Sequence, residues 1–324
     1  MEYRILGNSG MTVSRLCVGG CPMGGYNWGQ VDDVDLLETI HFAVENGITM
    51  FDTADTYGLG HSEEVLGKAL GKERKDIVIA TKFGVRYSNG HSYYDNSSEY
   101  IEDAIVGSLK RLKTDYIDLY QIHYRDYVTP IEVVVEKLSE LRQRGLVRYF
   151  GLSNIFQKDI SELIPFKHEF VSFQNEYSLA TRKNEEIIRE VSETLELTPM
   201  TWGSLGQGIL SGKYNKDVIF GTDDRRSKDI YVNFHGDKLM KNLEIVEMLS
   251  SIACNYNKSI PATAIRFILD HIKDSIVLVG VKNKRQLKSN LEALDWKLFL
   301  SDIKQLLNIS ESNYCEQSTI GLEN

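Results

Sequence analysis

Residues 49–80 read TMFDTADTYGLGHSEEVLGKALGKERKDIVIA, and this stretch contains the signals of a strand, a helix and a second strand. The apolar residues within 49–52 predict the first strand, and those of 77–80 predict the second. Residues 63–70 predict the helix between them. A strand, a helix and a strand in this order are typical of two parallel strands joined by a helical crossover.

The same order recurs along the 324 residues of the chain. The predicted strands cover residues 16–18, 49–52, 77–80, 116–122, 147–152, 170–173, 200–202 and 276–279. The predicted helices cover residues 34–45, 63–70, 98–110, 131–142, 156–164, 185–195, 239–256, 262–271 and 286–294. Eight strands that alternate with helices predict an α/β fold, the (β/α)8 TIM barrel, as a single domain over residues 1–324. The helices 239–256 and 262–271 are extra elements near the C-terminus, before the last strand.

An open, doubly wound sheet is the alternative fold, and it would carry a GxGxxG turn early in the chain. The early glycine pairs, at residues 19–20 and 24–25, do not have that spacing. Residues 3–6 and 11–13 flank the sequence GNSG at 7–10, which predicts a β-hairpin before the first barrel strand. We expect this hairpin to plug the N-terminal end of the barrel.

Composition narrows the class of protein. The net charge of −9 argues against general affinity for nucleic acid or an anionic membrane. No apolar run approaches the roughly 20 residues that a membrane span needs, and the first residues, MEYR, lack the features of a signal peptide. We therefore expect a cytoplasmic protein. The four cysteines are scattered without a CxxC pair, which argues against a zinc site or a disulfide framework.

Polar residues follow successive predicted strands: Asp52 and Tyr57 after the second, Lys82 after the third and His123 after the fourth. The ends of parallel barrel strands converge on one mouth, where catalytic groups lie. The four residue types suit carbonyl reduction, in which a tyrosine can act as the acid. A lysine cation would lower the pKa of that tyrosine from its ordinary value of about 10. An aspartate would keep the lysine charged, and a histidine would orient the carbonyl oxygen.

The segments around these residues resemble the aldo-keto reductase superfamily, from about Tyr3 to Leu294. The resemblance rests on FDTADTYG (51–58), EEVLGKAL (63–70), ATKFG (80–84), DYIDLYQIH (115–123), FGLSN (150–154) and FQNEY (173–177). The branch that it resembles most includes bacterial reductases and potassium-channel β subunits.

The resemblance implies an NADPH-dependent oxidoreductase that reduces the carbonyl of an aldehyde, ketone or sugar. Asp52, Tyr57, Lys82 and His123 would form the catalytic tetrad. A hydride would pass from C4 of the nicotinamide to the substrate carbon while Tyr57 protonates the oxygen. The resemblance also implies that the nicotinamide carboxamide would be held by Ser153, Asn154 and Gln174.

Two further segments resemble cofactor sites of the family. LGQGILSGKY (205–214) resembles the loop over the pyrophosphate, and it implies contacts from Leu205, Gln207, Gly208, Leu210, Gly212 and Lys213. GVKNKRQLKSN (280–290) resembles the adenosine site, and it implies contacts from Gly280, Lys282, Gln286 and Asn290. The start of a helix is a favourable place for a phosphate. Lys282 is the first candidate partner of the 2′-phosphate, with Lys284 and Arg285 in reserve, and this basic cluster favours NADPH over NADH.

The sequence departs from relatives after the seventh strand, where Trp202-Gly203-Ser204 replaces a common Tyr-Ser-Pro run. We expect Trp202 to stack on the nicotinamide instead. Trp28 and Tyr124 are expected to line the substrate pocket together with Tyr57 and His123. Other aromatic or loop residues over the mouth are Tyr26, Tyr87 and residues 223–233.

Rival functions remain open at this point. The barrel could hold NADPH and report redox state to a partner, as the channel β subunits are thought to do. It could also oxidise and re-reduce its substrate within one cycle, as an isomerase, epimerase or dehydratase. A metal-dependent barrel is disfavoured because no cluster of His and carboxylates follows the strands, so no metal is expected. The partner is expected to be a small carbonyl compound, and an oligomer is possible.

Overall fold

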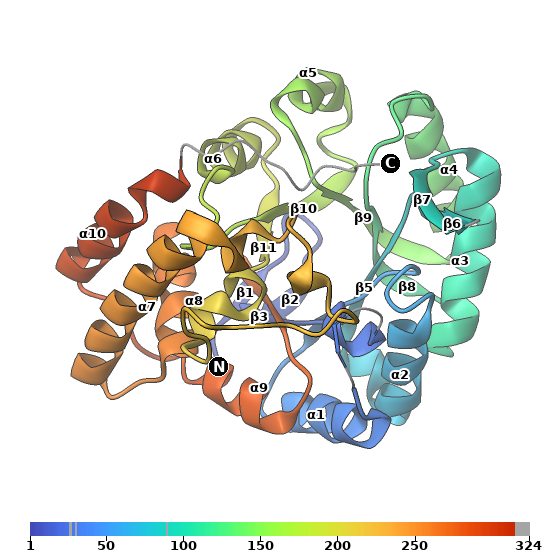
Figure 1. Cartoon of the computed structure of the whole chain (residues 1–324). Helices are drawn as coiled ribbons and strands as arrows, with labels where there is room; N and C mark the ends of the chain where they lie inside the picture. The colour runs from blue at the N-terminus through green and yellow to red at the C-terminus, as the bar shows by residue number, and fades with distance from the viewer. Residues whose placement is uncertain (26–27, 30, 89, 315–324) are drawn as a thin grey trace.

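The computed structural model describes residues 1–25, 28–29, 31–88 and 90–314, and Figure 1 shows their arrangement. Eight parallel strands close into a barrel in the order β10-β11-β12-β3-β4-β5-β8-β9. These strands are β3 (Leu16–Gly19), β4 (Met50–Asp52), β5 (Val78–Phe83), β8 (Ile117–Ile122), β9 (Val147–Ser153), β10 (Phe170–Glu176), β11 (Thr198–Trp202) and β12 (Ile276–Gly280). The predicted TIM barrel is therefore confirmed.

Helices surround the barrel (Figure 1). They are α1 (Asp33–Glu45), α2 (His61–Leu70), α3 (Ser98–Leu112), α4 (Ile131–Gln143), α5 (Ile160–Leu163), α6 (Glu185–Thr194), α7 (Gly236–Tyr256), α8 (Ile260–His271), α9 (Lys284–Leu291) and α10 (Leu300–Ile309). Side chains cap the N-termini of several helices. The Asp32 side chain accepts a hydrogen bond from the backbone N–H of Val34 at the start of α1, and the Ser97 side chain accepts one from the backbone N–H of Tyr100 at the start of α3. Within the described ranges, no helix is both long and apolar enough to cross a membrane.

The helix predicted over residues 156–164 is wrong in its extent. The structure forms a 3-10 turn at Gln157–Asp159, then the single turn α5, then another 3-10 turn at Ile164–Phe166. The Asp159 carboxylate accepts a hydrogen bond from the backbone N–H of Phe156 at 2.8 Å, which stabilises the first 3-10 turn. Pro165 lacks the N–H that would continue the α-helical bonding, so the helix ends at once.

A second hairpin was not predicted. Strand β6 (Val85–Ser88) pairs antiparallel with β7 (His91–Tyr94) between β5 and α3. The sequence between the two strands, Asn89-Gly90, is itself a strong hairpin signal. Most side chains of both strands are exposed, so these strands lack the apolar pattern by which the buried strands were predicted.

The N-terminal hairpin plugs the barrel, as expected. Strand β1 (Tyr3–Ile5) pairs antiparallel with β2 (Thr12–Ser14). Leu6, next to β1, and Val13, in β2, join a buried cluster whose other members come from barrel strands: Cys17, Met50, Ala80, Leu119, Val171, Met200, Ile276 and Leu278. The Tyr149 hydroxyl donates to the carbonyl of Ser9 at 2.6 Å, which fixes the turn against β9.

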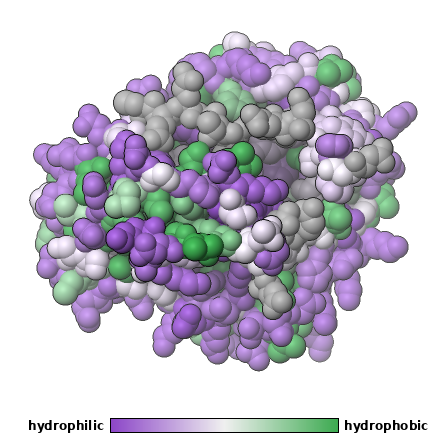
Figure 2. All heavy atoms as spheres, viewed as in Figure 1, coloured by the Kyte–Doolittle hydropathy of each residue, from purple (hydrophilic) through white to green (hydrophobic). Residues whose placement is uncertain are grey.

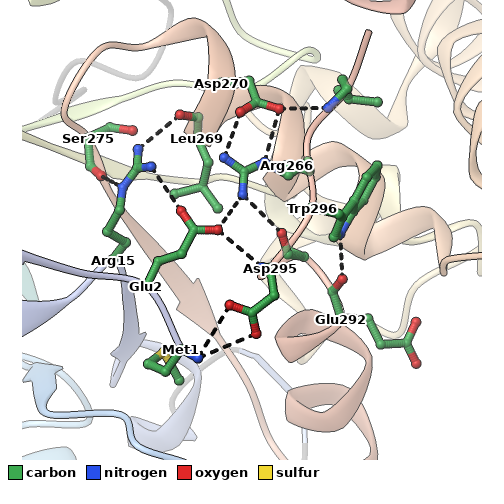
Figure 3. Close-up of polar contacts among 12 residues, drawn as sticks. Met1, Glu2, Arg15, Arg266, Leu269, Asp270, Ser275, Glu292, Asp295 and Trp296 are labelled. Carbon is green, nitrogen blue, oxygen red and sulfur yellow. Dashed lines mark hydrogen bonds and ion pairs between the residues drawn. The ribbon is translucent and has the colours of Figure 1, made fainter. Parts of the chain in front are cut away.

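Buried charges tie the N-terminus to α8 (Figure 3). The guanidinium of Arg266, only 1% exposed, lies 2.7 Å from Asp270 Oδ1 and 2.7 Å from Glu2 Oε1. Burial alone would raise the pKa of Glu2, but the charge and hydrogen bond of Arg266 lower it below its ordinary value. Arg15 adds a second ion pair to Glu2 at 3.2 Å. The network joins the first residues of the chain to helices formed near its end.

Candidate active site

Lys82 organises the mouth of the barrel. Its Nζ lies 2.6 Å from Asp52 Oδ1, 3.1 Å from the Tyr57 hydroxyl and 2.9 Å from the carbonyl oxygen of Thr53. Lys82 is 1% exposed and Asp52 is 3% exposed. The carboxylate of Asp52 compensates the buried ammonium of Lys82, which also contacts the tyrosine hydroxyl. Asp52 lies in β4, Lys82 lies in β5 and Tyr57 lies in the loop after β4, so two neighbouring parallel strands bring the three residues together.

Tyr57 is held by its loop. Its backbone N–H donates to the carbonyl of Ala54 at 3.1 Å, and its carbonyl accepts from Ser62 at 3.2 Å. Next to it, Gly58 has φ 62°, and a Cβ there would lie 2.2 Å from the carbonyl oxygen of Gly24. Only glycine permits both this conformation and this close approach. The contact presses the loop after β3 against the loop that carries the tyrosine.

The structure corrects one expectation about Tyr57. We expected Lys82 to lower its pKa, but burial, together with Cys21 and Asp52, raises that pKa well above 10. The phenol is therefore fully protonated at neutral pH. The physical reason is desolvation, which disfavours the phenolate more than the nearby ammonium favours it. A protonated phenol is the form that can donate a proton.

His123 lies beside Tyr57, with ring centroids 5.8 Å apart in an edge-to-face arrangement. Burial and the Lys82 charge lower the pKa of His123 well below its ordinary value, so the imidazole is neutral. Its Nδ1 is buried without a hydrogen-bond partner among the residues that the structure describes. A neutral imidazole can offer one N–H to an incoming oxygen.

Gln174 lies beneath the tetrad. Its Nε2 donates to Asp52 Oδ2 at 2.5 Å and to Gln121 Oε1 at 2.8 Å. Gln121 in turn donates to Asp52 Oδ2 at 3.1 Å. The structure thus shows Gln174 supporting Asp52, and its amide nitrogen is engaged there. Sequence reasoning missed Gln121, although its position two residues before His123 places both side chains on the same face of β8.

Ser153 and Asn154 lie at the end of β9, next to His123. The Asn154 Nδ2 donates to the His123 carbonyl at 3.0 Å and lies 3.1 Å from Ser153 Oγ. Asn154 has φ 56°, and its backbone N–H donates to the Gln174 carbonyl at 2.7 Å. The structure therefore brings both predicted residues to the tetrad.

The loop after β11 crosses in front of the barrel (Figure 1). It begins at Trp202, whose Nε1 is buried without a partner in the described part of the chain. A 3-10 segment, Gly206–Ser211, follows, with positive φ at Gly206, Gln207 and Gly208. The Gln207 amide donates to Glu176 Oε1 at 2.9 Å, which anchors the loop to β10.

The other predicted residues of this loop differ in burial. Leu205 is half-buried and Leu210 is fully buried, whereas Gly212 and Lys213 are exposed. Leu210 is therefore a packing residue that holds the loop down. A Cβ at Gly212 would lie 2.6 Å from the side chain of Ile260, so this glycine lets the loop reach α8.

The residues after β12 form a second group. Gly280 ends the strand, Lys282 follows, and Gln286 and Asn290 lie on α9. The Lys282 N–H donates to Gln286 Oε1 at 2.8 Å, and the Lys282 ammonium donates to the carbonyl of Trp28. Asn290 is buried. The predicted adenosine residues therefore lie together at one edge of the mouth.

Arg226 completes a cationic cluster that sequence reasoning missed. Burial lowers the pKa of Lys282, and the positive charges of Arg226 and Lys213 lower it further. Arg226 itself bonds Asp224 through Nε at 2.9 Å and through Nη2 at 2.5 Å. The basic pair at residues 225–226 was a visible signal, but the segment was interpreted only as part of the substrate rim.

Aromatic rings line the mouth. Tyr124 stacks on Tyr94 of the unpredicted hairpin at 4.8 Å and on His123 at 5.3 Å. Trp28 forms an isolated antiparallel bridge with Asp224, so the loops after β3 and β11 meet across the barrel. The predicted mouth residue Tyr26 lies outside the described residues. Hydrophilic side chains dominate this face, and hydrophobic ones form small groups near its centre and at scattered places around it (Figure 2).

The model of the Aldo/keto reductase family matches residues 15–311 of the chain. The chain belongs to this family. Aldo-keto reductase YhdN of Bacillus subtilis (strain 168) is 35% identical over 317 residues, covering 96% of this chain and 94% of that protein. An NADH-specific methylglyoxal reductase of Escherichia coli (strain K12) is 28% identical, covering 95% of this chain and 98% of that protein.

A solved structure is similar over nearly the whole chain. The glycerol dehydrogenase of Gluconobacter oxydans superposes with a TM-score of 0.86 at 30% identity, covering 99% of this chain and 98% of that chain. Membership of the aldo-keto reductase family makes the protein an oxidoreductase of a family that uses nicotinamide cofactors. The family resemblance expected from the sequence is confirmed.

Proposed function

We propose that this aldo-keto reductase reduces the carbonyl group of a small aldehyde, ketone or sugar to an alcohol with NADPH. The observation that carries the proposal is the position of Lys82, whose ammonium contacts both Asp52 and the Tyr57 hydroxyl. This arrangement places a protonated phenol beside a neutral imidazole at the mouth of the barrel. Both groups can donate a hydrogen bond to one carbonyl oxygen.

The residues present fit a nicotinamide dinucleotide. Two buried polar atoms at the strand ends, His123 Nδ1 and Trp202 Nε1, lack partners among the described residues. Gly206 and Gly208 let the backbone of the loop approach a ligand closely. The cationic cluster of Lys213, Arg226 and Lys282 matches the charge of phosphate groups.

Each residue of the tetrad has a defined task in the proposed reaction. NADPH, when bound, supplies the hydride that reduces the substrate carbon. Tyr57 transfers the proton of its hydroxyl to the carbonyl oxygen, and the Lys82 ammonium stabilises the phenolate that remains. Asp52 keeps Lys82 charged, and His123 orients the oxygen through an N–H. Ser153 and Asn154 are proposed to hold the carboxamide. Trp202 is proposed to stack on the nicotinamide.

The cationic cluster favours NADPH over NADH in this proposal. One relative is an NADH-specific methylglyoxal reductase, so membership of the family alone does not decide between the cofactors. The names of that relative and of the glycerol dehydrogenase indicate that those two proteins act on a small carbonyl compound or alcohol. We propose the same class of substrate here.

The first test is a titration of the purified protein with NADPH and NADH, followed by protein fluorescence. The same samples are then mixed with a panel of aldehydes, ketones and sugars while absorbance of the reduced nicotinamide is recorded. Tight NADPH binding with turnover is the expected result. Tight binding without turnover would instead support a redox reporter or an internal-redox isomerase.

Lys282→Ala should raise the Kd of NADPH about tenfold or more while changing that of NADH little, because one charge-assisted contact to a phosphate is lost. Fluorescence titration measures both constants. Lys288→Ala is the matched control, since it removes one exposed positive charge from α9 at a residue that was not predicted to bind the cofactor. Equal losses of affinity for NADPH and NADH would show that Lys282 does not bind the 2′-phosphate.

A further inference from the structure

Two glutamine side chains inside the barrel contact the aspartate of the tetrad. Gln121 lies in β8 and Gln174 in β10, and they are 0% and 1% exposed, so their amides must find partners within the protein. The two amide nitrogens lie 3.1 Å and 2.5 Å from Asp52 Oδ2, and the Gln174 nitrogen also lies 2.8 Å from Gln121 Oε1. The reaction proposed above gives Gln121 no task.

The donors and acceptors of this group fit one another. A carboxylate only accepts hydrogen bonds, so each glutamine turns its amide nitrogen toward Asp52. The Gln174 nitrogen has two hydrogens, which Asp52 Oδ2 and Gln121 Oε1 accept. Asp52 Oδ1 accepts from the Lys82 ammonium at 2.6 Å. The carboxylate thus divides its two oxygens between the amides and the lysine.

The neighbouring strands leave room for Gln121 in this place. In the register of the parallel strands, Gln121 is paired with Lys82 of β5 on one side and with Gly151 of β9 on the other. A Cβ at Gly151 would lie 2.9 Å from Gln121 Cγ, which is closer than a real side chain approaches. Glycine at this position therefore leaves the space that the Gln121 side chain occupies.

The contact between Lys82 and Tyr57 depends on how Asp52 is turned. The ammonium donates to Asp52 Oδ1 and, at 3.1 Å, to the phenolic oxygen, which leaves the phenol its own proton for a substrate. The terminal torsion of an aspartate is soft, so an unsupported carboxylate rotates easily. Two N–H donors on Oδ2 oppose this rotation. A displacement of about 1 Å at such a group can cost about 10²-fold in rate.

We propose that Gln121 is a positioning residue for the proton transfer, which holds the Asp52 carboxylate so that the Lys82 ammonium stays on the Tyr57 hydroxyl. This inference rests on the proposed function, and it adds a residue that the resemblance to the family did not assign. In this role Gln121 acts through Asp52, directly and through the amide of Gln174.

The first test replaces the amide by an apolar side chain of similar length. Gln121→Met removes the donor to Asp52 and the acceptor of Gln174. Ser172→Ala is the matched control, because it removes a buried hydroxyl from β10 that has no partner among the described residues. Initial rates give kcat and KM for the carbonyl compound of the panel that the unmodified protein reduces fastest. Fluorescence titration gives the Kd of NADPH.

We expect Gln121→Met to lower kcat about ten- to hundredfold, because it leaves a buried N–H of Gln174 without a partner and lets Asp52 rotate. KM and the Kd of NADPH should change less than about threefold, since the amide lies beneath the tetrad. Ser172→Ala should leave all three constants nearly unchanged. An unchanged kcat in Gln121→Met, or an equal loss in Ser172→Ala, would overturn the inference.

The second test uses a side chain of the same shape that can lose a proton. Gln121→Glu keeps an acceptor for Gln174, but it donates to Asp52 only while its carboxyl is protonated. The nearby Asp52 carboxylate raises the pKa of the introduced carboxyl above its ordinary value of about 4.3. We therefore expect kcat of this variant, relative to the unmodified protein at the same pH, to rise about tenfold from about pH 8.5 to about pH 5.5.

The comparison at equal pH removes the titration of other groups near the tetrad. The pKa of Asp55 is about 7, and its effect is common to both proteins. The pKa of Tyr57 and that of Cys17 lie well above their ordinary values, and that of His123 lies well below. The same ratio for Gln121→Met should not depend on pH. A ratio for Gln121→Glu that is also independent of pH would overturn the inference.

Failure of the proposed function is a separate outcome. If the unmodified protein reduces no carbonyl compound, the reductase assignment fails, and crystal structures decide the inference instead. In Gln121→Met, the distance from Lys82 Nζ to the Tyr57 hydroxyl oxygen should rise from 3.1 Å to more than about 3.5 Å. An unchanged distance would overturn the inference. If Gln121→Met does not fold, Gln121→Glu at about pH 8.5 takes its place in both measurements.

Discussion

At the scale of single residues, the proposed chemistry depends on Lys82 and Tyr57. The ammonium lies 3.1 Å from the phenolic oxygen and 2.6 Å from the Asp52 carboxylate. Burial holds the phenol in its protonated form. In the proposed reaction, Tyr57 keeps its proton until a carbonyl oxygen accepts it, and the Lys82 ammonium then stabilises the phenolate. Under this proposal, a tyrosine with a high pKa can still serve as the acid.

Tyr57→Phe should lower kcat/KM for carbonyl reduction about 10²- to 10⁴-fold, because the proton donor is lost. The Kd of NADPH should not change. Steady-state rates and fluorescence titration measure the two effects. Tyr120→Phe is the control, since that hydroxyl is also buried and has no partner among the described residues. A Tyr57→Phe variant as active as the unmodified protein would refute the assigned acid.

Asp55 is a second titratable residue in the Tyr57 loop. Burial raises its pKa from 3.8 to about 7. One oxygen lies 2.8 Å from the Tyr100 hydroxyl, and the other is buried without a partner within the described ranges. A cavity of about 300 Å³ lies beside it, outside the barrel. The charged form of this carboxyl is therefore poorly compensated in the folded protein.

The raised pKa of Asp55 makes the stability of the folded protein depend on pH in a defined direction. The folded protein binds the proton more tightly than the unfolded chain, so the group reduces the free energy of unfolding as pH rises from about 4 to about 7. Asp55→Asn should remove a penalty of at most about 4 kcal/mol at pH 8 and much less at pH 4. Urea denaturation at both pH values measures the difference, and a pH-independent effect would contradict the shift.

At the scale of elements, the loops after β3, β4 and β11 build the site by meeting one another. Gly58 packs on Gly24, and Trp28 pairs with Asp224. The β6–β7 hairpin adds Tyr94, which stacks on Tyr124. The barrel strands supply a rigid base, while these contacts determine where the aromatic and charged side chains point. The lining of the candidate site therefore depends on contacts between these loops as well as on the barrel strands.

Gly58→Ala should separate the loops after β3 and β4 and lower kcat/KM by about 10²-fold, because a displacement of about 1 Å misplaces a catalytic group. The added Cβ would lie 2.2 Å from Gly24 O. Gly145→Ala is the control, because its φ of 76° imposes similar backbone strain but no atom lies within 4 Å. Comparable rates for both variants would show that the contact does not position Tyr57.

At the scale of the whole molecule, charge networks close the fold on the side away from the mouth. Arg266 joins α8 to Glu2 at the start of the chain, and Met1 contacts Asp295 beyond α9 (Figure 3). The barrel has no free strand edge because β12 pairs with β3. The N-terminal hairpin and the C-terminal helices are thereby fixed to the same side.

Arg266→Ala should lower the free energy of unfolding by about 3–5 kcal/mol, because it leaves Asp270 and Glu2 without their buried partner. Arg144→Ala should cost much less, since that ion-paired arginine is 42% exposed and solvent screens its charge. Urea denaturation at neutral pH compares the variants. Similar losses would mean that burial does not distinguish these networks.

The order of strands and helices along the chain was sufficient to predict the barrel, because each element has a local pattern of apolar residues. It also located Asp52, Tyr57, Lys82 and His123, since parallel strands bring their ends to one mouth wherever they lie in the sequence. The helix over 156–164 was wrong because Asp159 and Pro165 interrupt it. The assignment to a single domain over residues 1–324 stays a prediction.

The tertiary structure alone decided the features that depend on residues distant in the chain. It placed Gln121 and Gln174 on Asp52, and it joined Trp28 of the loop after β3 to Asp224 of the loop after β11. It also reversed the expected pKa shift of Tyr57. Desolvation and charge interactions depend on distances through space, and the identity and spacing of residues along the chain do not contain those distances.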